Sequence, residues 1–194
     1  REGDVMNADL LVYQAKAFYN AYIALDQLSR DDSDTLLLLF APLVVNGAFS
    51  VELALKAILA KNQIEYGKEH NLLILFQMLP KSFQQELWAY LIEKAPEYAG
   101  SEKGLDELIL LSNAFVDWRY AFEGKPVPAI ESRFLAAFAN AAVHTMFSYY
   151  NVDLLPATKT ESNNEIEQRF HENREKCKEI NLKMIQKKTK EHQL

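Results

Sequence analysis

The most constraining feature of this sequence is one long apolar segment. Residues 35–51 carry no charge, and from residue 41 to residue 60 apolar side chains would point in nearly every direction around a helix. A helix that is apolar on all sides is buried in the middle of a bundle. A membrane span needs about 20 predominantly apolar residues, whereas this segment also contains Pro42 and Gly47. We therefore predict a buried core helix that starts near residue 35 or 42 and ends near residue 62, and no membrane span.

Apolar residues at helical spacing mark the remaining elements. Their spacing of three and four residues predicts helices, and no stretch shows the sustained two-residue alternation of a half-buried strand. Asn71 is placed to cap a short helix that Pro80 would stop. Breaks that contain Gly and Pro separate the later segments. The sequence therefore predicts an all-α domain of about five to six helices, whose other helical segments are residues 4–29, 72–79, 82–94, 105–120 and 130–150.

The composition changes after Pro156. The preceding residues carry the helical pattern, whereas the following ones are mostly polar and charged. We therefore predict a helical bundle at residues 1–156 and a charged helical tail at residues 157–194. The tail packs on the body or on a partner, or it is a partly solvated helix that frays toward its end. A weak apolar pattern in the tail favours packing; it consists of Ile166, Phe170, Cys177, Ile180 and Met184.

The charge and the single cysteine limit the possible functions. The formal net charge is −6, so contact with RNA would need a local basic patch. Cys177 is the only cysteine, which leaves neither an intramolecular disulfide nor a cysteine pair for zinc. A reducing cytoplasm is the simplest environment for such a chain. Glycine-rich phosphate loops, nucleophile elbows and metal-binding histidine pairs are missing from the sequence, so we expect no cofactor and no metal, and the interpretation as an enzyme is weakened.

Two charged residues interrupt the apolar segment. Glu52 and Lys56 are four residues apart, which places them on one face of a helix. An ion pair on a helix surface is the ordinary explanation of this spacing. The helix around them is predicted to be buried, however, and buried charges need partners. The pair is therefore either structural or part of a ligand site.

Two further positions carry side chains suited to an anionic ligand. His70 directly precedes a helix, whose free backbone N–H groups attract anions, although it is otherwise an ordinary loop histidine near a cap. Arg119 lies between two aromatic residues, Trp118 and Tyr120. It could hold a phosphate or stack on a base, or it could pair with a nearby carboxylate. The candidate ligand-binding residues are therefore Glu52, Lys56, His70, Arg119 and Tyr120.

His144 is the other histidine within the predicted bundle. It lies among Ala, Val, Met and Phe residues. This environment favours a core histidine with its hydrogen bonds satisfied over a functional one.

The order of these residues resembles the HEPN family. Glu52-x-x-x-Lys56 is followed, a dozen residues later, by Glu69-His70-Asn71-Leu72. These motifs are similar to the Glu-x-x-x-Lys and His-Asp/Asn-Leu landmarks of HEPN domains. Arg119-Tyr120 is similar to the Arg-Tyr element of some members. The resemblance covers about residues 8–150.

The resemblance implies an antiparallel up-and-down helical bundle, often dimeric. Many members are RNases of toxin–antitoxin, abortive-infection and CRISPR-linked systems, and others are noncatalytic RNA-, nucleotide- or partner-binding units. The RNases cleave without a metal, using the RNA 2′-hydroxyl, and carry an Arg, four to six residues, and then a His. His144 is preceded at that spacing by Ala137, Phe138 and Ala139, and His70 by Gln63, Ile64 and Glu65. His171 and His192 also lack an Arg there.

We therefore expect a cytoplasmic HEPN-like domain without the standard RNase motif. It would bind RNA, a nucleotide or a protein partner in a prokaryotic defence, toxin–antitoxin or stress system. The alternatives are an atypical metal-independent RNase with a rearranged site and a noncatalytic interaction module. We also expect a homodimer, because the aromatic residues 130–150 and the tail offer more apolar surface than one small bundle needs.

Overall fold

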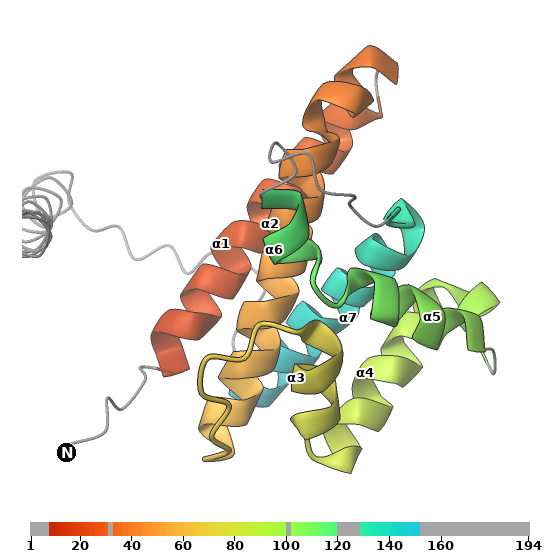
Figure 1. The fold of residues 1–194 in the computed structure, drawn as a ribbon. Helices are drawn as coiled ribbons and strands as arrows, with labels where there is room; N and C mark the ends of the chain where they lie inside the picture. Colours follow the sequence, from red (N-terminus) through yellow and green to blue (C-terminus); the bar gives the residue numbers. More distant parts are fainter. Residues whose placement is uncertain (1–7, 31–32, 100–101, 120–128, 152–194) are drawn as a thin grey trace, which may run out of the picture. The chain divides into compact units, whose positions relative to one another are not determined.

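The computed structural model describes residues 8–30, 33–99, 102–119 and 129–151, all of which belong to the first of two units, residues 1–154 and 155–194 (Figure 1). These described residues are helical and contain no strand, so the predicted all-α bundle is confirmed. The predicted boundary at Pro156 and the tail at residues 157–194 lie outside the described residues and stay predictions.

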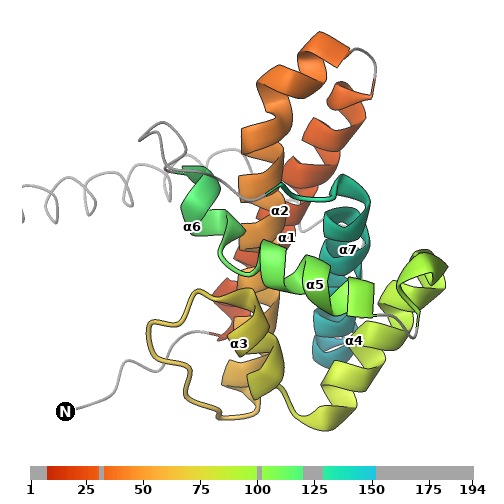
Figure 2. The same ribbon diagram turned by 45° about the vertical axis from the view of Figure 1, so that its right-hand side comes forward.

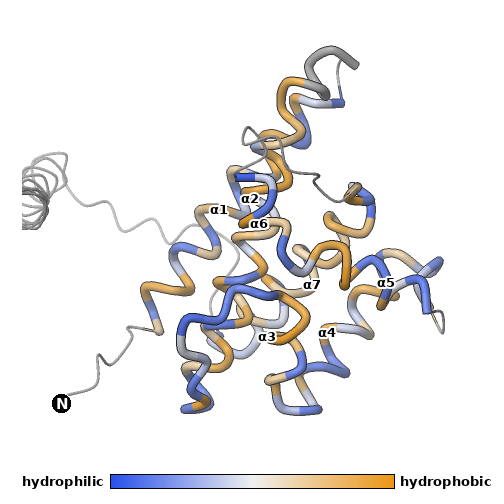
Figure 3. The backbone as a smooth tube through the Cα atoms, in the orientation of Figure 1, coloured by the Kyte–Doolittle hydropathy of each residue, from blue (hydrophilic) through white to orange (hydrophobic). Residues whose placement is uncertain are grey.

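The central element is α2 (Ser33–Lys61), which packs against α1, α3, α6 and α7. Residues 50–59 are all buried, which confirms the predicted core helix. Figure 3 shows that the tube of α2 is coloured mainly as hydrophobic. Pro42 lies inside this helix rather than in its first turn, and the side chain of Asn46 donates a hydrogen bond to its carbonyl at 2.7 Å.

Two long helices flank α2. α1 (Ala8–Ser29) forms an antiparallel hairpin with it, and the closed end of this hairpin extends beyond the other helices (Figures 1 and 2). α7 (Ser132–Tyr150) packs on both. The three helices meet closely at Gly47, where a Cβ atom would lie 3.0 Å from side-chain atoms of Tyr22 and Leu135. Glycine therefore permits this approach because it has no side chain.

The shorter helices cover the rest of the core. α3 (Leu72–Met78) begins at Asn71, whose side chain accepts from the N–H of Ile74 at 3.0 Å, as predicted for this cap. α4 (Lys81–Lys94) packs on α7 and is followed by the 3-10 turn η1 (Pro96–Tyr98).

The segment predicted as one helix at residues 105–120 is two helices. α5 (Glu102–Leu111) ends at a turn formed by Ser112 and Asn113, and α6 (Ala114–Arg119) follows. The carbonyl of Ser112 accepts from the N–H of Leu72 at 2.8 Å. The side chain of Asn113 accepts from that of Asn71 at 3.1 Å. The prediction was wrong here because contacts with a distant segment, rather than a local breaker, interrupt the helix.

Among the described residues, α2 is the one helix long and apolar enough to cross a membrane, between Leu38 and Lys61. Fifty-six per cent of its most apolar window is nevertheless buried inside the bundle. This is what the central helix of a bundle shows, since a lipid-facing helix would leave that surface uncovered.

Candidate functional site

One face of α2 carries the predicted ion pair. Phe49, Glu52 and Lys56 are three and four residues apart, so they form a stripe along that face. The Nζ atom of Lys56 donates to Oε1 of Glu52 at 2.7 Å. The side chains of Glu52 and Lys56 are only 2% and 10% exposed. The pair is therefore a buried one, unlike an ordinary pair on a helix surface.

His70 joins the same carboxylate from the connection between α2 and α3. Its Nδ1 lies 2.9 Å from Oε1 of Glu52, and its side chain is 52% exposed. Because an ionised carboxylate only accepts hydrogen bonds, Nδ1 carries the proton of this bond. Oε1 of Glu69 accepts from the backbone N–H groups of His70 and Asn71 at 2.9 and 2.7 Å, which fixes the backbone here. The Nε2 edge of the imidazole is thus directed away from Glu52.

Tyr66 lies beside the buried pair. The Nζ atom of Lys56 is 5.4 Å from the centroid of its ring. Burial raises the pKa of the Tyr66 hydroxyl, and the negative charge of Glu52 raises it further. The Tyr66 hydroxyl and Oε2 of Glu52 are both buried without a hydrogen-bond partner in the part of the chain that the structure describes. The cluster therefore has unused polar groups beneath a half-exposed histidine.

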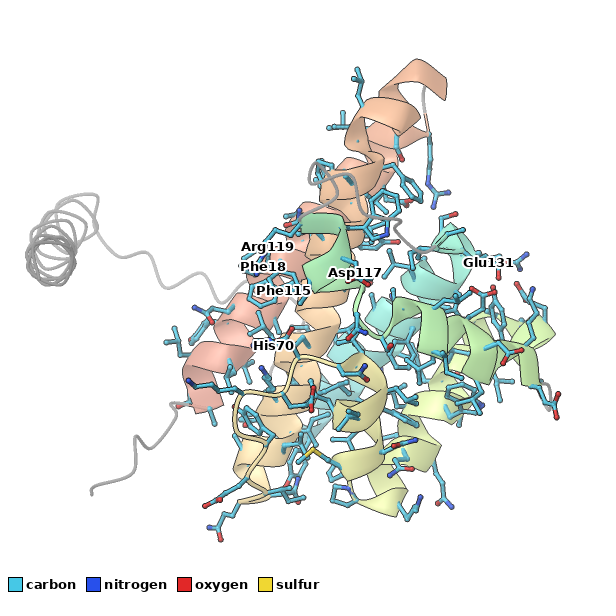
Figure 4. The ribbon with its side chains drawn as sticks, in the orientation of Figure 1. Phe18, His70, Phe115, Asp117, Arg119 and Glu131 are labelled. Atoms are coloured by element: carbon cyan, nitrogen blue, oxygen red, sulfur yellow. The ribbon has the colours of Figure 1, made fainter. Side chains whose placement is uncertain are left out.

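Arg119 reaches α2 through aromatic rings. Its guanidinium lies 4.7 Å from the ring centroid of Phe115, which stacks on Phe49 at 4.3 Å. Phe18 of α1 packs edge-on against Phe49 at 4.5 Å. Figure 4 shows Arg119, Phe18 and Phe115 where α6 crosses the hairpin, with His70 nearer α3. Phe49 precedes Glu52 by three residues, a rise of about 4.5 Å along the helix, so the aromatic group and the ion-pair cluster adjoin each other.

The predicted residues are thus brought together in part. Glu52, Lys56 and His70 form one cluster, and the exposed Arg119 lies on the adjoining aromatic group. Tyr120 lies outside the described residues. The Phe18–Phe49–Phe115 group was missed in the sequence because its members come from three separate helices.

The environment of His144 differs from the predicted one. Its ring stacks on that of Tyr90 from α4, with centroids 4.0 Å apart and an interplanar angle of 15°. The residue is half-buried, and its Nδ1 is buried without a hydrogen-bond partner among the residues described. The predicted core histidine with satisfied hydrogen bonds is therefore wrong, because the ring of Tyr90 covers one face of the imidazole while its Nδ1 has no hydrogen-bond partner among the described residues.

Tyr19 of α1 lies close to the same side of α7. The side chain of Asn140, one turn before His144, donates to the hydroxyl of Tyr19 at 2.7 Å. Burial raises the pKa of this tyrosine, and the hydrogen bond from Asn140 partly opposes the effect. Within the described ranges, no group of three or more His, Cys, Asp or Glu side chains could hold a metal ion.

Comparison with known proteins finds a match to a family model. Residues 41–132 match the model of the HEPN domain, a match that includes Glu52, Lys56, His70 and Arg119 and ends at the start of α7. No curated protein and no solved structure matches the chain. The match indicates a function related to RNA or to nucleotides. The match supports the HEPN domain family for residues 41–132 of this chain.

Proposed function

We propose that this chain binds RNA or a nucleotide on the surface formed by His70, Phe115 and Arg119, which we call the His70–Arg119 surface. In this proposal the chain binds its ligand without cleaving it. The setting that fits the family is a prokaryotic defence, toxin–antitoxin or stress system.

The observation that carries the proposal is the way in which two exposed side chains are held. Glu52 holds the Nδ1 atom of His70, whose side chain is 52% exposed. The ring of Phe115 supports the guanidinium of Arg119 from one side. A side chain that is already oriented loses less conformational freedom when a ligand binds.

These groups match the chemistry of a nucleotide. An arginine donates hydrogen bonds to phosphate in a planar fork and also stacks on aromatic faces. An imidazole donates to phosphate when protonated and accepts from a hydroxyl when neutral. Because the whole chain has a net charge of −6, a local pair of this kind must supply the attraction for a polyanion.

A rearranged, metal-independent ribonuclease is the second candidate. The observation that favours it is the Glu52–His70 hydrogen bond, because a carboxylate that holds Nδ1–H leaves Nε2 free to take a proton. The standard motif of the family is missing from the sequence, since no histidine follows an arginine at the required spacing. Binding without cleavage is therefore the function that we propose first.

The test measures binding of the full chain to a fluorescent single-stranded RNA and, separately, to ATP. We expect Arg119→Ala and His70→Ala each to weaken binding by about tenfold or more, corresponding to the loss of about one charge-assisted contact. The thermal midpoint should change little for Arg119→Ala and fall by about 2–4 °C for His70→Ala, which also loses the hydrogen bond to Glu52. Arg133→Ala is the matched control, because Arg133 is also exposed but lies on α7, where it pairs with Glu97 at 2.6 Å.

The two ligands separate the possible sources of the phosphate. Binding of RNA but not of ATP would identify a polynucleotide ligand, and the reverse would identify a mononucleotide. Incubation of the RNA with chelator and wild-type protein, followed by gel analysis, detects cleavage. Cleavage that His70→Ala abolishes would replace our proposal by the ribonuclease. Wild-type protein that binds neither ligand would refute both and leave a protein partner.

A further inference from the structure

The amide of Asn113 adjoins the His70–Arg119 surface. Asn113 is exposed and belongs to the turn between α5 and α6, two residues before Phe115. Its Oδ1 accepts a hydrogen bond from Nδ2 of Asn71 at 3.1 Å, and Asn71 directly follows His70 in the sequence. This bond therefore joins the connection before α3 to the start of α6, the two segments that carry the two halves of the surface.

A relay of hydrogen bonds fixes the direction of the Asn113 amide. The backbone N–H of Ile74 donates to Oδ1 of Asn71 at 3.0 Å, so the NH2 end of the Asn71 amide is the end that faces Asn113. An NH2 group only donates, so the end of Asn113 that faces it is the oxygen. The NH2 group of Asn113 is therefore directed away from Asn71, and it makes no hydrogen bond within the part of the chain that the structure describes.

We propose that Asn113 selects the base of the ligand and favours a base with a carbonyl oxygen over a base with an amino group. The inference rests on the function proposed above, because it needs a nucleotide or RNA on the same surface. An NH2 group that is not yet bonded is satisfied by a carbonyl oxygen, whereas an amino group is itself a donor. Uracil and guanine carry a carbonyl oxygen where cytosine and adenine carry an amino group.

The same relay disfavours the usual contact of asparagine with adenine. That contact is bidentate and uses both ends of the amide, the oxygen for the amino group of adenine and the NH2 group for its N7. In this structure Asn71 already occupies the oxygen of Asn113. The end of Asn113 that remains for a ligand is a donor only, which suits a carbonyl oxygen.

Asn113 and Arg119 are placed for different parts of one ligand. They are six residues apart, a rise of about 9 Å along a helix. The guanidinium of Arg119 is charged and suits a phosphate, whereas the amide of Asn113 is uncharged and suits the edge of a base. In contacts with nucleic acids, phosphate contacts position the ligand and base contacts specify it. Asn113 is therefore the residue of this surface that specifies.

The test compares the binding of the full chain to two short single-stranded RNAs, one made only of uridine and the other only of cytidine. The two bases differ in the carbonyl or amino group and in the ring nitrogen beside it. We expect the wild type to bind the uridine RNA about tenfold more tightly, because the cytidine RNA sets a donor against a donor. UTP and CTP form a second pair, which shows whether the base is read in a mononucleotide or in RNA.

Two variants reverse the relay without removing it. In Asn113→Asp, one carboxylate oxygen still accepts from Asn71 and the other faces the ligand. In Asn71→Asp, the cap on Ile74 is kept, but the second carboxylate oxygen requires the NH2 group of Asn113, so the Asn113 amide turns and its oxygen faces the ligand. We expect both variants to prefer the cytidine RNA and to keep the thermal midpoint of the wild type. Each adds one negative charge, so the ratio of the two affinities is the readout.

Asn20→Asp is the matched control, because it makes the same substitution at an exposed asparagine on α1, and it should keep the preference for uridine. Equal affinities of the wild type within both pairs of ligands would overturn the selection by Asn113 and leave the binding function standing. A preference for uridine that survives Asn71→Asp or Asn113→Asp in a folded variant would overturn it as well, and either variant alone suffices for this outcome. Wild-type protein that binds none of the four ligands would refute the proposed function and this inference with it.

Discussion

His70 lies in the connection before α3, 2.9 Å from the carboxylate of Glu52, whereas His144 lies within α7 and stacks on Tyr90 at 4.0 Å. The first imidazole is half-exposed with its Nδ1 bonded, and the second is half-buried with its Nδ1 buried and unbonded within the described residues. One ring is thus fixed by a hydrogen bond, and the other by packing.

The difference shows that the two histidines of this bundle differ in which of their polar groups are buried and which remain available to a ligand. At the His70 cluster the buried groups are the charged side chains of Glu52 and Lys56, and the exposed imidazole of His70 remains available to a ligand. At the His144 site the polar atom is the buried one, where it costs free energy without contributing a bond. The four predictions below test this contrast, from the largest expected effect to the smallest.

Removal of Glu52 should have the largest effect on stability. Glu52→Leu leaves Lys56 buried without its counterion, and we expect the free energy of unfolding to fall by about 3–5 kcal/mol. The double variant Glu52→Leu/Lys56→Met should recover most of this loss, because both buried charges are then absent. Urea unfolding measures both quantities.

The matched control for this variant is the exposed pair of Asp26 and Arg30, which has the same spacing of four residues. Arg30→Met should change the unfolding free energy little, since exposed ion pairs are screened by water. A double variant at Glu52 and Lys56 that is as unstable as the single one would contradict the interpretation of the pair as a buried charge balance.

Truncation of Tyr90 should have the next largest effect. Tyr90→Ala removes a half-buried ring and its stack on His144, so we expect a loss of about 2 kcal/mol. Tyr90→Phe keeps the ring and should leave the stability nearly unchanged. If Tyr90→Phe were as destabilising as Tyr90→Ala, the hydroxyl of Tyr90 would hold this site together rather than its ring.

The same substitution at the two histidines should have opposite signs. His144→Phe keeps the stacked ring and removes a buried, unbonded nitrogen, so we expect a gain of about 0.5–1 kcal/mol. His70→Phe loses the hydrogen bond to Glu52 and should lower the stability by about 1 kcal/mol. Thermal and urea unfolding of both variants would decide the matter. Two changes of the same sign would show that the two histidines are held alike.

The parts of this picture that local pattern determines could be predicted from the sequence. The burial of α2 followed from an apolar pattern on every side of one helix. The meeting of Glu52, Lys56 and His70 followed from a spacing of four residues and a short connection. Each of these depends on positions that are close in the chain.

Contacts between distant segments could not be predicted in this way. The helix break at Ser112 depends on the N–H of Leu72, and the unbonded state of His144 depends on which residue of α4 faces it. The support of Arg119 by Phe115 and Phe49 joins two helices more than sixty residues apart in the sequence. In each case the partner is far away in the sequence, so the residues next to Ser112, His144 or Arg119 do not indicate the contact.

The smallest effect concerns Tyr66, beside Glu52. Burial and the charge of Glu52 raise the pKa of its hydroxyl above the ordinary value of about 10. As the pH rises above about 10, the unfolded chain loses this proton before the folded chain does, so the unfolding free energy falls until the folded-state pKa is passed. Tyr66→Phe has no such proton. It should match the wild type within about 0.5 kcal/mol near pH 8 and lose less stability between about pH 8 and pH 10.5.

Burial also raises the pKa values of Tyr22, Tyr98 and Tyr150, so the alkaline loss of stability in Tyr66→Phe should be smaller than in the wild type but should not vanish. Tyr13→Phe, at an exposed tyrosine, is the control. Equal alkaline losses in the wild type and Tyr66→Phe would show that the folded chain does not disfavour the Tyr66 phenolate, and would remove Tyr66 from the Glu52 cluster.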